Sequence, residues 1–312
     1  MNKFLISGSS GFVGKNLINY LKNNMTCELF GLNTKCNVQH NLNKNFVWNE
    51  LSSLKNMDVY IHLAGKAHDL KKTSSSEEYY KVNTDLTKSF FDTFIKSKAE
   101  TFIYLSSVKA VADSVDGELK ENHAPKPITD YGKSKLLAEE YIQSKGNLYD
   151  KRVYILRPCM IHGPGNKGNL NLLFKLISKG IPWPLGCFNN KRSFCSLDNL
   201  LFVINELINN RNIPSGIYNI SDDQPLSTNE IISLINKTQN KKSSIWNVPK
   251  SIIYLLARVG DKIKLPLNSE NLKKLTESYV VSNNKLKDSL GKTFPVKSKD
   301  GMIKTFKSFN LN

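Results

Sequence analysis

Short β-branched or aromatic runs alternate with longer segments of helical periodicity through residues 1–160, and this alternation limits the chain to few folds. Most runs are continuously apolar, as expected of strands that helices cover on both faces. Repeated strand–helix units predict an α/β fold with a doubly wound parallel sheet. Strands are expected at 3–7, 27–33, 58–65, 101–107 and 151–158, and helices at 13–21 and 77–98. In the longer helix, the spacing predicts that Val82, Leu86, Phe90 or Phe91, and Phe94 face the core.

The pattern of the sequence changes after Pro158. A loop at 162–169 and a short helix at 171–180 precede a segment rich in proline and glycine at 181–194. A helix and a strand after this segment are expected to rejoin the first sheet, at 198–209 and 216–222. The sequence therefore predicts a first domain at 1–165, with 196–222 rejoining it, and a smaller, mostly helical domain at 166–195 and 223–312.

Three glycines follow the first strand directly and open the first helix. Gly8 permits a tight turn, Gly11 lets the backbone approach a pyrophosphate, and Gly14 lets helix and strand pack closely. Amide groups at the helix N-terminus suit phosphates. A plain glycine-rich turn is the alternative, but the strand–turn–helix context favours a dinucleotide site in a Rossmann sheet. The expected contacts in this turn are Gly8, Ser10, Gly11, Phe12 and Val13.

The end of the second strand should separate NAD from NADP, because an acidic side chain there holds the ribose 2′-hydroxyl of NAD. This chain has Asn33 at that place and no acid. Lys35 follows and could meet a 2′-phosphate, although a lysine on a lysine-rich surface is more often simply solvated. The cofactor is therefore expected to be NAD or NADP, with a slight preference for NADP and with Asn33 and Lys35 as contacts.

A tyrosine and a lysine four residues apart, Tyr131 and Lys135, would share one face of a helix. A free tyrosine has a pKa of about 10, and a fixed ammonium nearby is a means of lowering it. Ser106 and Ser107 end the fifth strand, at the carboxyl edge where doubly wound sheets bind ligands. The tyrosine–lysine spacing also arises by chance, and two serines can simply cap a strand. Their combination with the glycine turn favours a catalytic group.

The glycine spacing, the H-L-A-G segment and Y-G-K-S-K together resemble the extended short-chain dehydrogenase/reductase family, of the NAD-dependent epimerase/dehydratase type. The resemblance covers nearly the whole chain. It implies a triad in which Tyr131 is the general acid/base, Ser107 polarises the sugar oxygen, and Lys135 tunes the pKa and anchors a ribose. Ser106 is the second candidate for the serine, and Asn83 is expected to organise structure. The further cofactor contacts implied are Leu63, Ala64, Gly65, Tyr131 and Lys135.

The segment at 156–165 resembles one in nucleotide-sugar epimerases and reductases, with His162 in place of the usual tyrosine. We expect His162 to be packed rather than catalytic. Arg192 resembles the family arginine that grips a nucleotide diphosphate, and a guanidinium suits bidentate phosphate binding. The resemblance thus implies a nucleotide-diphosphate sugar, with UDP as the expected nucleotide. The substrate contacts implied are Ser107, Asn169 and Arg192.

The direction of the chemistry is less constrained than its class. The S-S-V-K and N-K-R-S-F segments look most like 4-ketoreductases of UDP-N-acetylated deoxyhexoses in bacterial surface polysaccharide synthesis. The alternative is a UDP-glucose or UDP-N-acetylglucosamine 4-epimerase, which uses the same triad. A 4,6-dehydratase is not expected, because Val108 and Lys109 stand where that class has an Asp-Glu pair. A non-catalytic dinucleotide sensor commonly lacks the tyrosine–lysine pair that this chain has.

The composition restricts the partners. The net charge is +17, but the lysines are dispersed and no basic block occurs, so nucleic acid is not expected. The five cysteines are widely spaced without a C-x-x-C pair, so neither a disulfide framework nor a metal site is expected. No apolar run approaches the roughly 20 residues of a membrane span. We expect a cytoplasmic protein without stable membrane insertion, and a homodimer is one possible assembly.

The segment from Val248 to Lys264 is apolar on one side and basic on the other. Such a helix could lie on a membrane surface. A helix that covers the substrate cleft of the second domain is the interpretation that the sequence favours.

Overall fold

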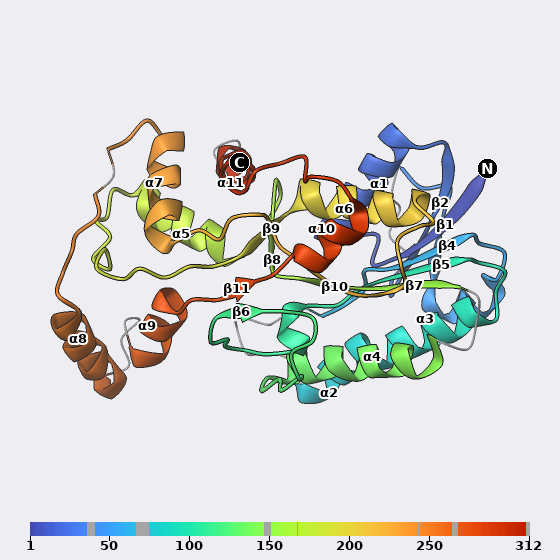
Figure 1. Ribbon diagram of the computed structural model, residues 1–312, viewed down its shortest axis with the longest axis horizontal. Helices are drawn as coiled ribbons and strands as arrows, with labels where there is room; N and C mark the ends of the chain where they lie inside the picture. The colour runs from blue at the N-terminus through green and yellow to red at the C-terminus, as the bar shows by residue number, and fades with distance from the viewer. Residues whose placement is uncertain are drawn as a thin grey trace.

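A seven-stranded parallel sheet organises the part of the molecule that carries the N-terminus (Figure 1). The computed structural model describes residues 1–35, 41–66, 75–146, 151–166, 168–242, 244–263 and 268–309. Its strand order is β3-β2-β1-β4-β5-β7-β10, which is the doubly wound order with an added strand at one edge. The predicted fold class is thereby confirmed. The strands are β1 Asn2–Ser7, β2 Cys27–Asn33, β3 Lys44–Val47, β4 Val59–His62, β5 Thr101–Leu105, β7 Arg152–Pro158 and β10 Gly216–Ile220.

Helices cover both faces of this sheet, because successive side chains of each strand point to opposite sides. In β1, Phe4 and Ile6 pack with α1 (Phe12–Asn24) and α6 (Leu197–Asn209). Leu5, between them, belongs to the core on the other face, which aromatic residues of α3 (Leu86–Ile95) and residues of α4 (Asp130–Gly146) complete. All three β1 side chains are fully buried, as the continuous apolar runs predicted.

The long helix predicted at 77–98 is interrupted. It consists of α2 (Ser76–Tyr79), a π-helical turn η2 (Tyr80–Asp85) and α3. Phe90, Phe91 and Phe94 are buried as predicted, whereas Val82, within the π turn, and Leu86, directly after it, are only partly buried. The side chains that are buried instead are Asn83, Thr84 and Thr87. Each of them forms a hydrogen bond, which offsets the loss of hydration when a polar side chain is buried.

The rest of the chain forms a second, largely helical part at the far end of the molecule in Figure 1. A separate apolar core joins α5, α7, α8, α9 and α11 through residues such as Phe174, Ile232, Ile253, Leu272 and Phe306. The helices of this part are α5 Asn169–Ser178, α7 Thr228–Thr238, α8 Lys250–Ile263, α9 Ser269–Thr276 and α11 Ser298–Phe309. Helix α10, Asn284–Leu290, packs instead against β10 of the main sheet. Two short sheets pair β8 (Met160–His162) with β9 (Phe194–Ser196), and β6 (Glu118–Leu119) with β11 (Val280–Val281).

The segments predicted at 198–209 and 216–222 correspond to α6 and β10, and β10 pairs with β7 in the main sheet. The exact domain boundaries stay a prediction. Lys264, the end of the predicted amphipathic segment, lies outside the described residues, as does Lys167 in the loop at 162–169.

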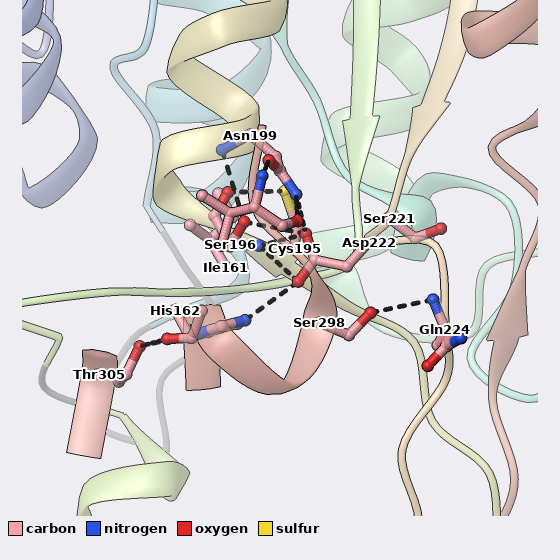
Figure 2. A network of polar contacts seen from close by, with 12 residues as sticks. Ile161, His162, Cys195, Ser196, Asn199, Ser221, Asp222, Gln224, Ser298 and Thr305 are labelled. Carbon is pink, nitrogen blue, oxygen red and sulfur yellow. Dashed lines mark hydrogen bonds and ion pairs between the residues drawn. The ribbon is translucent and has the colours of Figure 1, made fainter. Parts of the chain in front are cut away.

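A buried polar network connects the two parts of the molecule (Figure 2). Asp222, just after β10, accepts hydrogen bonds from the Ser196 hydroxyl at 2.9 Å and the Asn199 side chain at 2.7 Å. His162 lies 3.3 Å from the Asp222 carboxylate through Nε2 and 2.9 Å from the Thr305 hydroxyl through Nδ1. His162 is thus a fully buried packing residue that ties β8 to α11.

Candidate active site

The three glycines of the first turn are required by close backbone contacts. Gly8 has φ +69°, and a Cβ there would lie 2.6 Å from the Ala64 nitrogen. A Cβ at Gly14 would lie 2.3 Å from the Gly8 carbonyl oxygen. Gly11 is exposed and precedes α1 with extended backbone, and its amide donates to the Gly8 carbonyl at 3.0 Å. The turn is therefore tight and leaves its outer backbone accessible to a ligand.

The first turn of α1 carries neither an acidic residue nor a side-chain cap. Phe12 and Val13 begin this helix and are partly buried. Amide groups left without a cap at a helix N-terminus, with the positive end of the helix dipole, favour an anion. The residues present therefore fit the pyrophosphate of a dinucleotide.

Asn33 closes the side of this turn at the end of β2. Its Oδ1 accepts from the Ser10 hydroxyl at 3.0 Å, and its Nδ2 donates to the Ser9 hydroxyl at 2.7 Å. The side chain is buried and holds the turn, whereas Lys35 is exposed to solvent. Asn33 thus shapes the cofactor turn through two hydrogen bonds.

The H-L-A-G segment runs beside the glycine turn. The amide of Leu63 donates to the Ser7 carbonyl at 3.1 Å, and that of Ala64 donates to the Ser7 hydroxyl at 3.3 Å. Gly65 is exposed, and a Cβ there would lie 3.0 Å from Lys135 Nζ. Thus the predicted second cofactor segment and the predicted catalytic lysine lie at the same edge of the sheet.

The two serines after β5 have different partners. The Ser106 hydroxyl donates to Glu139, a fully buried carboxylate on α4. The Ser107 hydroxyl accepts from the Lys109 amide at 3.2 Å, and its interaction with Tyr131 lowers the pKa of that phenol. Ser107 is therefore the serine that acts on Tyr131. Ser106 instead binds Glu139 of α4 and helps to hold that helix against the sheet.

Burial is the larger influence on Tyr131, and it raises the pKa of the phenol. The effects on the pKa of Tyr131 come from burial, Ser107 and Tyr79, and the expected lowering by Lys135 together with the oxidised nicotinamide stays a prediction. Lys135 Nζ donates to the Leu105 carbonyl at 2.9 Å. Burial lowers the pKa of Lys135 to about 8, and the Glu139 carboxylate opposes that shift.

Glu139 lies one helical turn after Lys135 and forms a buried ion pair with Arg157. The guanidinium donates to both carboxylate oxygens, at 3.1 Å, 3.0 Å and 2.5 Å. Both side chains are almost completely excluded from solvent. The pair fixes α4 against β7, so the register of the tyrosine and lysine relative to the sheet depends on it.

Asn83 lies in the π turn and connects three segments. Its Oδ1 accepts from the Lys66 amide at 2.7 Å, and its Nδ2 donates to the Lys66 carbonyl at 3.1 Å and to the Ser134 hydroxyl at 3.0 Å. These bonds hold the segment after H-L-A-G against α4. Asn83 thus organises the site, in the way the sequence led us to expect.

A second cation, Lys109, lies beside Arg192 and was not among the predicted site residues. Its Nζ donates to the Asp113 carbonyl at 2.8 Å and lies 4.6 Å from the centre of the Tyr279 ring. Burial lowers the pKa of Lys109, and the positive charge of Arg192 adds to this effect. Burial likewise lowers the pKa of Arg192, whose Nη1 donates to the Lys274 carbonyl at 2.7 Å. The Asp113 carboxylate, 3.8 Å from Lys109 Nζ, and Glu277 offset part of this positive charge, and the two cations form a candidate site for an anion.

Asn169, the third predicted substrate contact, is the first residue of α5 and is exposed. Among the described residues, no hydrogen bond joins it to Arg192 or Ser107. The same part of the chain contains no group of three or more histidine, cysteine, aspartate or glutamate side chains that could hold a metal ion. None of the helices in the described part of the chain is both long and apolar enough to cross a bilayer.

A doubly wound sheet whose carboxyl edge carries a glycine turn, a serine beside a tyrosine, and a buried lysine defines a dinucleotide-dependent enzyme. The profile of the NAD dependent epimerase/dehydratase family matches residues 4–221. A UDP-glucose 4-epimerase of Vibrio cholerae is 31% identical over 98% of this chain and 94% of the relative. The chain therefore belongs to the NAD dependent epimerase/dehydratase family, and it is an NAD-dependent enzyme.

Two further similarities are of interest. An N-acetyl-alpha-D-glucosaminyl-diphospho-ditrans,octacis-undecaprenol 4-epimerase of Escherichia coli O157:H7 is 29% identical over 63% of this chain and 59% of the relative. The solved structure of a UDP-glucuronic acid 4-epimerase from Bacillus cereus in complex with NAD superposes with a TM-score of 0.77. It covers 99% of this chain and 96% of that chain at 20% identity, which supports the shared fold.

Proposed function

We propose that the protein catalyses redox chemistry at C4 of a nucleotide-diphosphate sugar, with Ser107, Tyr131 and Lys135 as the catalytic residues. The single observation that carries the proposal is that Ser107, Tyr131 and Lys135 lie together at the sheet edge beside the glycine turn, where Ser107 lowers the pKa of the Tyr131 phenol and Lys135 Nζ lies 2.9 Å from the Leu105 carbonyl. A serine and a phenol that share one substrate oxygen can polarise a carbonyl and exchange a proton with it. When bound, the nicotinamide exchanges a hydride with C4.

The other residues of the site bind the cofactor and transfer the proton. Gly8, Gly11 and the start of α1 hold the pyrophosphate, and Lys135 contributes its ammonium to the ribose side. Tyr131 removes or returns the proton of the C4 oxygen while Ser107 keeps a hydrogen bond to that oxygen. Burial raises the pKa of the Tyr131 phenol. The positive charges of Lys135 and of the oxidised ring would oppose this effect and favour the phenolate.

Arg192 and Lys109 bind the diphosphate of the substrate in this proposal. Their neighbouring charges and partial desolvation favour an anion over water. Asn169 adds a polar contact at the start of α5. Lys109 also stands where a dehydratase has a carboxylic acid, so loss of the 6-hydroxyl group is not part of the proposed activity.

We propose 4-epimerisation as the first direction to test. The two curated relatives described above are both 4-epimerases, and the family is NAD dependent. Reduction of a 4-keto sugar is the other direction, which the S-S-V-K and N-K-R-S-F segments favour. Two incubations separate them: UDP-GlcNAc without added cofactor, and UDP-4-keto-6-deoxy-GlcNAc with reduced dinucleotide. Interconversion with UDP-GalNAc in the first supports epimerisation, and stoichiometric consumption of the reduced dinucleotide in the second supports the reductase.

Residues at the end of β2 are expected to decide whether the protein prefers NAD or NADP. Asn33 brings no negative charge against a 2′-phosphate, and Lys35 is free to approach one from solvent. This supports NADP as an acceptable cofactor besides NAD. Titration of both against wild type and Lys35→Gln tests it. Weaker NADP binding in the variant, with NAD unchanged, is expected; equal effects on both dinucleotides contradict a role for Lys35.

A sugar carried on a polyprenyl diphosphate is the second candidate substrate. One relative is named for such a substrate, and a diphosphate contact by Arg192 and Lys109 does not depend on which group lies beyond it. The exposed apolar face of α8 favours this candidate over other diphosphate sugars. An incubation with a short-chain polyprenyl diphosphate GlcNAc, analysed for the C4 epimer, tests it.

A further inference from the structure

The helix α8 carries two apolar faces, of which only one is covered. Ile253, Ala257 and Gly260 recur at helical spacing and are buried against the second core. On the adjoining face, five large apolar side chains remain open to solvent. They are Leu255 and Ile263 at 62% exposure, Leu256 at 48%, Ile252 at 47% and Val259 at 45%. Exposed apolar rows of this size mark an interaction surface.

Basic side chains border this row. Arg258 and Lys262 follow Leu255 by three and seven residues, so they flank it on the side away from the buried face. The acidic residue of α8, Asp261, accepts two hydrogen bonds from Ser269 at the start of α9, at 2.9 Å and 2.6 Å. Asp261 keeps its negative charge but is directed at α9, so the charges that border the apolar row are those of Arg258 and Lys262.

We propose that α8 docks the protein onto the surface of an anionic lipid bilayer, with the apolar row inserted at the level of the headgroups. A helix that is apolar on one face and basic at its border is suited to this position. The chain as a whole carries a net charge of +17, which adds long-range attraction to anionic lipid. α8 also lies at the end of the molecule opposite the N-terminus, where a flat surface can approach it (Figure 1).

A second copy of the chain is a poorer occupant. Two copies joined through α8 would bring together two helices with basic borders, and both chains carry a net charge of +17. Like charges at an interface oppose association. The sequence-based alternative, a helix over the substrate cleft, does not account for the row either, because those five side chains are uncovered.

The position of α8 relates it to the proposed diphosphate site. Arg192 donates to the Lys274 carbonyl in α9, and α9 packs against α8. A bilayer against α8 would therefore lie on the α9 side of the cations Arg192 and Lys109. This relation rests on the proposed function. The docking itself does not, because lipid binding is measured without sugar or dinucleotide.

The test is cosedimentation of the full chain with vesicles of phosphatidylcholine alone or mixed with phosphatidylglycerol. We expect binding to the mixed vesicles and little to phosphatidylcholine alone. The double variant Leu255→Glu/Val259→Glu should weaken binding by at least about tenfold. Arg258→Gln and Lys262→Gln should each weaken it about fivefold. Trp246, four residues before α8 and 56% exposed, should report binding by a blue shift of its fluorescence.

The matched control is Leu172→Glu/Leu176→Glu on α5. These leucines are exposed at 62% and 40%, close to the values of Leu255 and Val259, and the substitution adds the same charge. The control should bind vesicles like the wild type. Equal loss in both double variants, or no vesicle binding by the wild type, would overturn the proposal. A dimer that the α8 variant alone dissociates, in light scattering without lipid, would overturn it in favour of a second copy.

Discussion

The carboxyl edge of the main sheet and the far helix α8 differ in how completely their side chains are covered. At the sheet edge, Gly8 and Gly14 have no room for a methyl group, and Glu139 and Arg157 are sealed from water. On α8, five large apolar side chains face solvent. Tight packing at the edge fixes a catalytic geometry, which requires positions accurate to a fraction of an ångström. The exposed apolar row on α8 contributes no packing within the chain, so we expect it to contact another molecule.

The largest effect should come from Tyr131→Phe, because it removes the proposed acid/base group. Turnover should fall by about 10²–10⁴-fold, while NAD binding and vesicle binding stay close to wild type. Leu255→Glu/Val259→Glu should show the opposite pattern towards soluble UDP sugars, with turnover kept and vesicle binding lost. Steady-state kinetics and cosedimentation on both variants test this separation. A Tyr131→Phe enzyme with substantial turnover would show that another group moves the proton.

Glu139→Gln should be the largest change in stability. It leaves the Arg157 guanidinium buried without its counterion, which costs about 3–5 kcal/mol. The control is Glu270→Gln at the other end, where the Glu270–Lys274 pair on α9 is mostly exposed and is worth below about 1 kcal/mol. Urea unfolding of both variants measures the difference. Equal destabilisation would contradict the contrast between a sealed edge and an open far end.

Gly8→Ala and Gly180→Ala compare the two ends at the level of one methyl group. Both glycines have positive φ, +69° and +76°, so both variants should lose about 1–2 kcal/mol from backbone strain. Gly180 has nothing within 4 Å of its added Cβ, whereas the Gly8 methyl group would meet Ala64. Gly8→Ala should therefore lose about 2 kcal/mol more and also bind NAD more weakly. Chemical unfolding and NAD titration check both; equal losses would mean that the turn relaxes freely.

The pH dependence should show opposite signs for activity and stability. Burial lowers the pKa of Lys135 from 10.5 to about 8, so the unfolded chain binds more protons between these values. Stability from this group should therefore rise with pH across that window. Turnover, which requires the ammonium form, should fall about tenfold per pH unit above about 8. In Glu139→Gln the alkaline limb should move to lower pH, because the carboxylate raises the pKa of Lys135; an unmoved limb would assign it to another group.

Much of the sheet edge could be predicted from short-range spacing. The glycines, the tyrosine–lysine pair and the strand ends depend on local geometry that a few neighbouring residues specify. Strand β3, Lys44–Val47, was missed because four residues with only two large apolar side chains give no clear period. Of the predicted inward face of 77–98, Phe90, Phe91 and Phe94 are buried, but Val82 and Leu86 are only partly buried, because a π turn without a strong local signal changes the helical phase there.

The remaining omissions are long-range. Lys109 meets Tyr279, and Arg192 meets Lys274, across large separations in sequence that only the folded chain closes. The S-S-V-K segment placed Lys109 two residues after Ser107, and that was the available signal. For α8, the sequence indicated an amphipathic helix, but it could not tell which part of the apolar arc the core would cover.

The most direct test of the catalytic account follows the hydrogen at C4. Purified protein is incubated with UDP-GlcNAc deuterated at C4, and the product is analysed by mass spectrometry and NMR. Hydride transfer to and from a bound dinucleotide predicts UDP-GalNAc that retains the deuterium at C4, with no such product from Tyr131→Phe. Loss of the deuterium to water would show proton abstraction from carbon, and would contradict redox chemistry at C4.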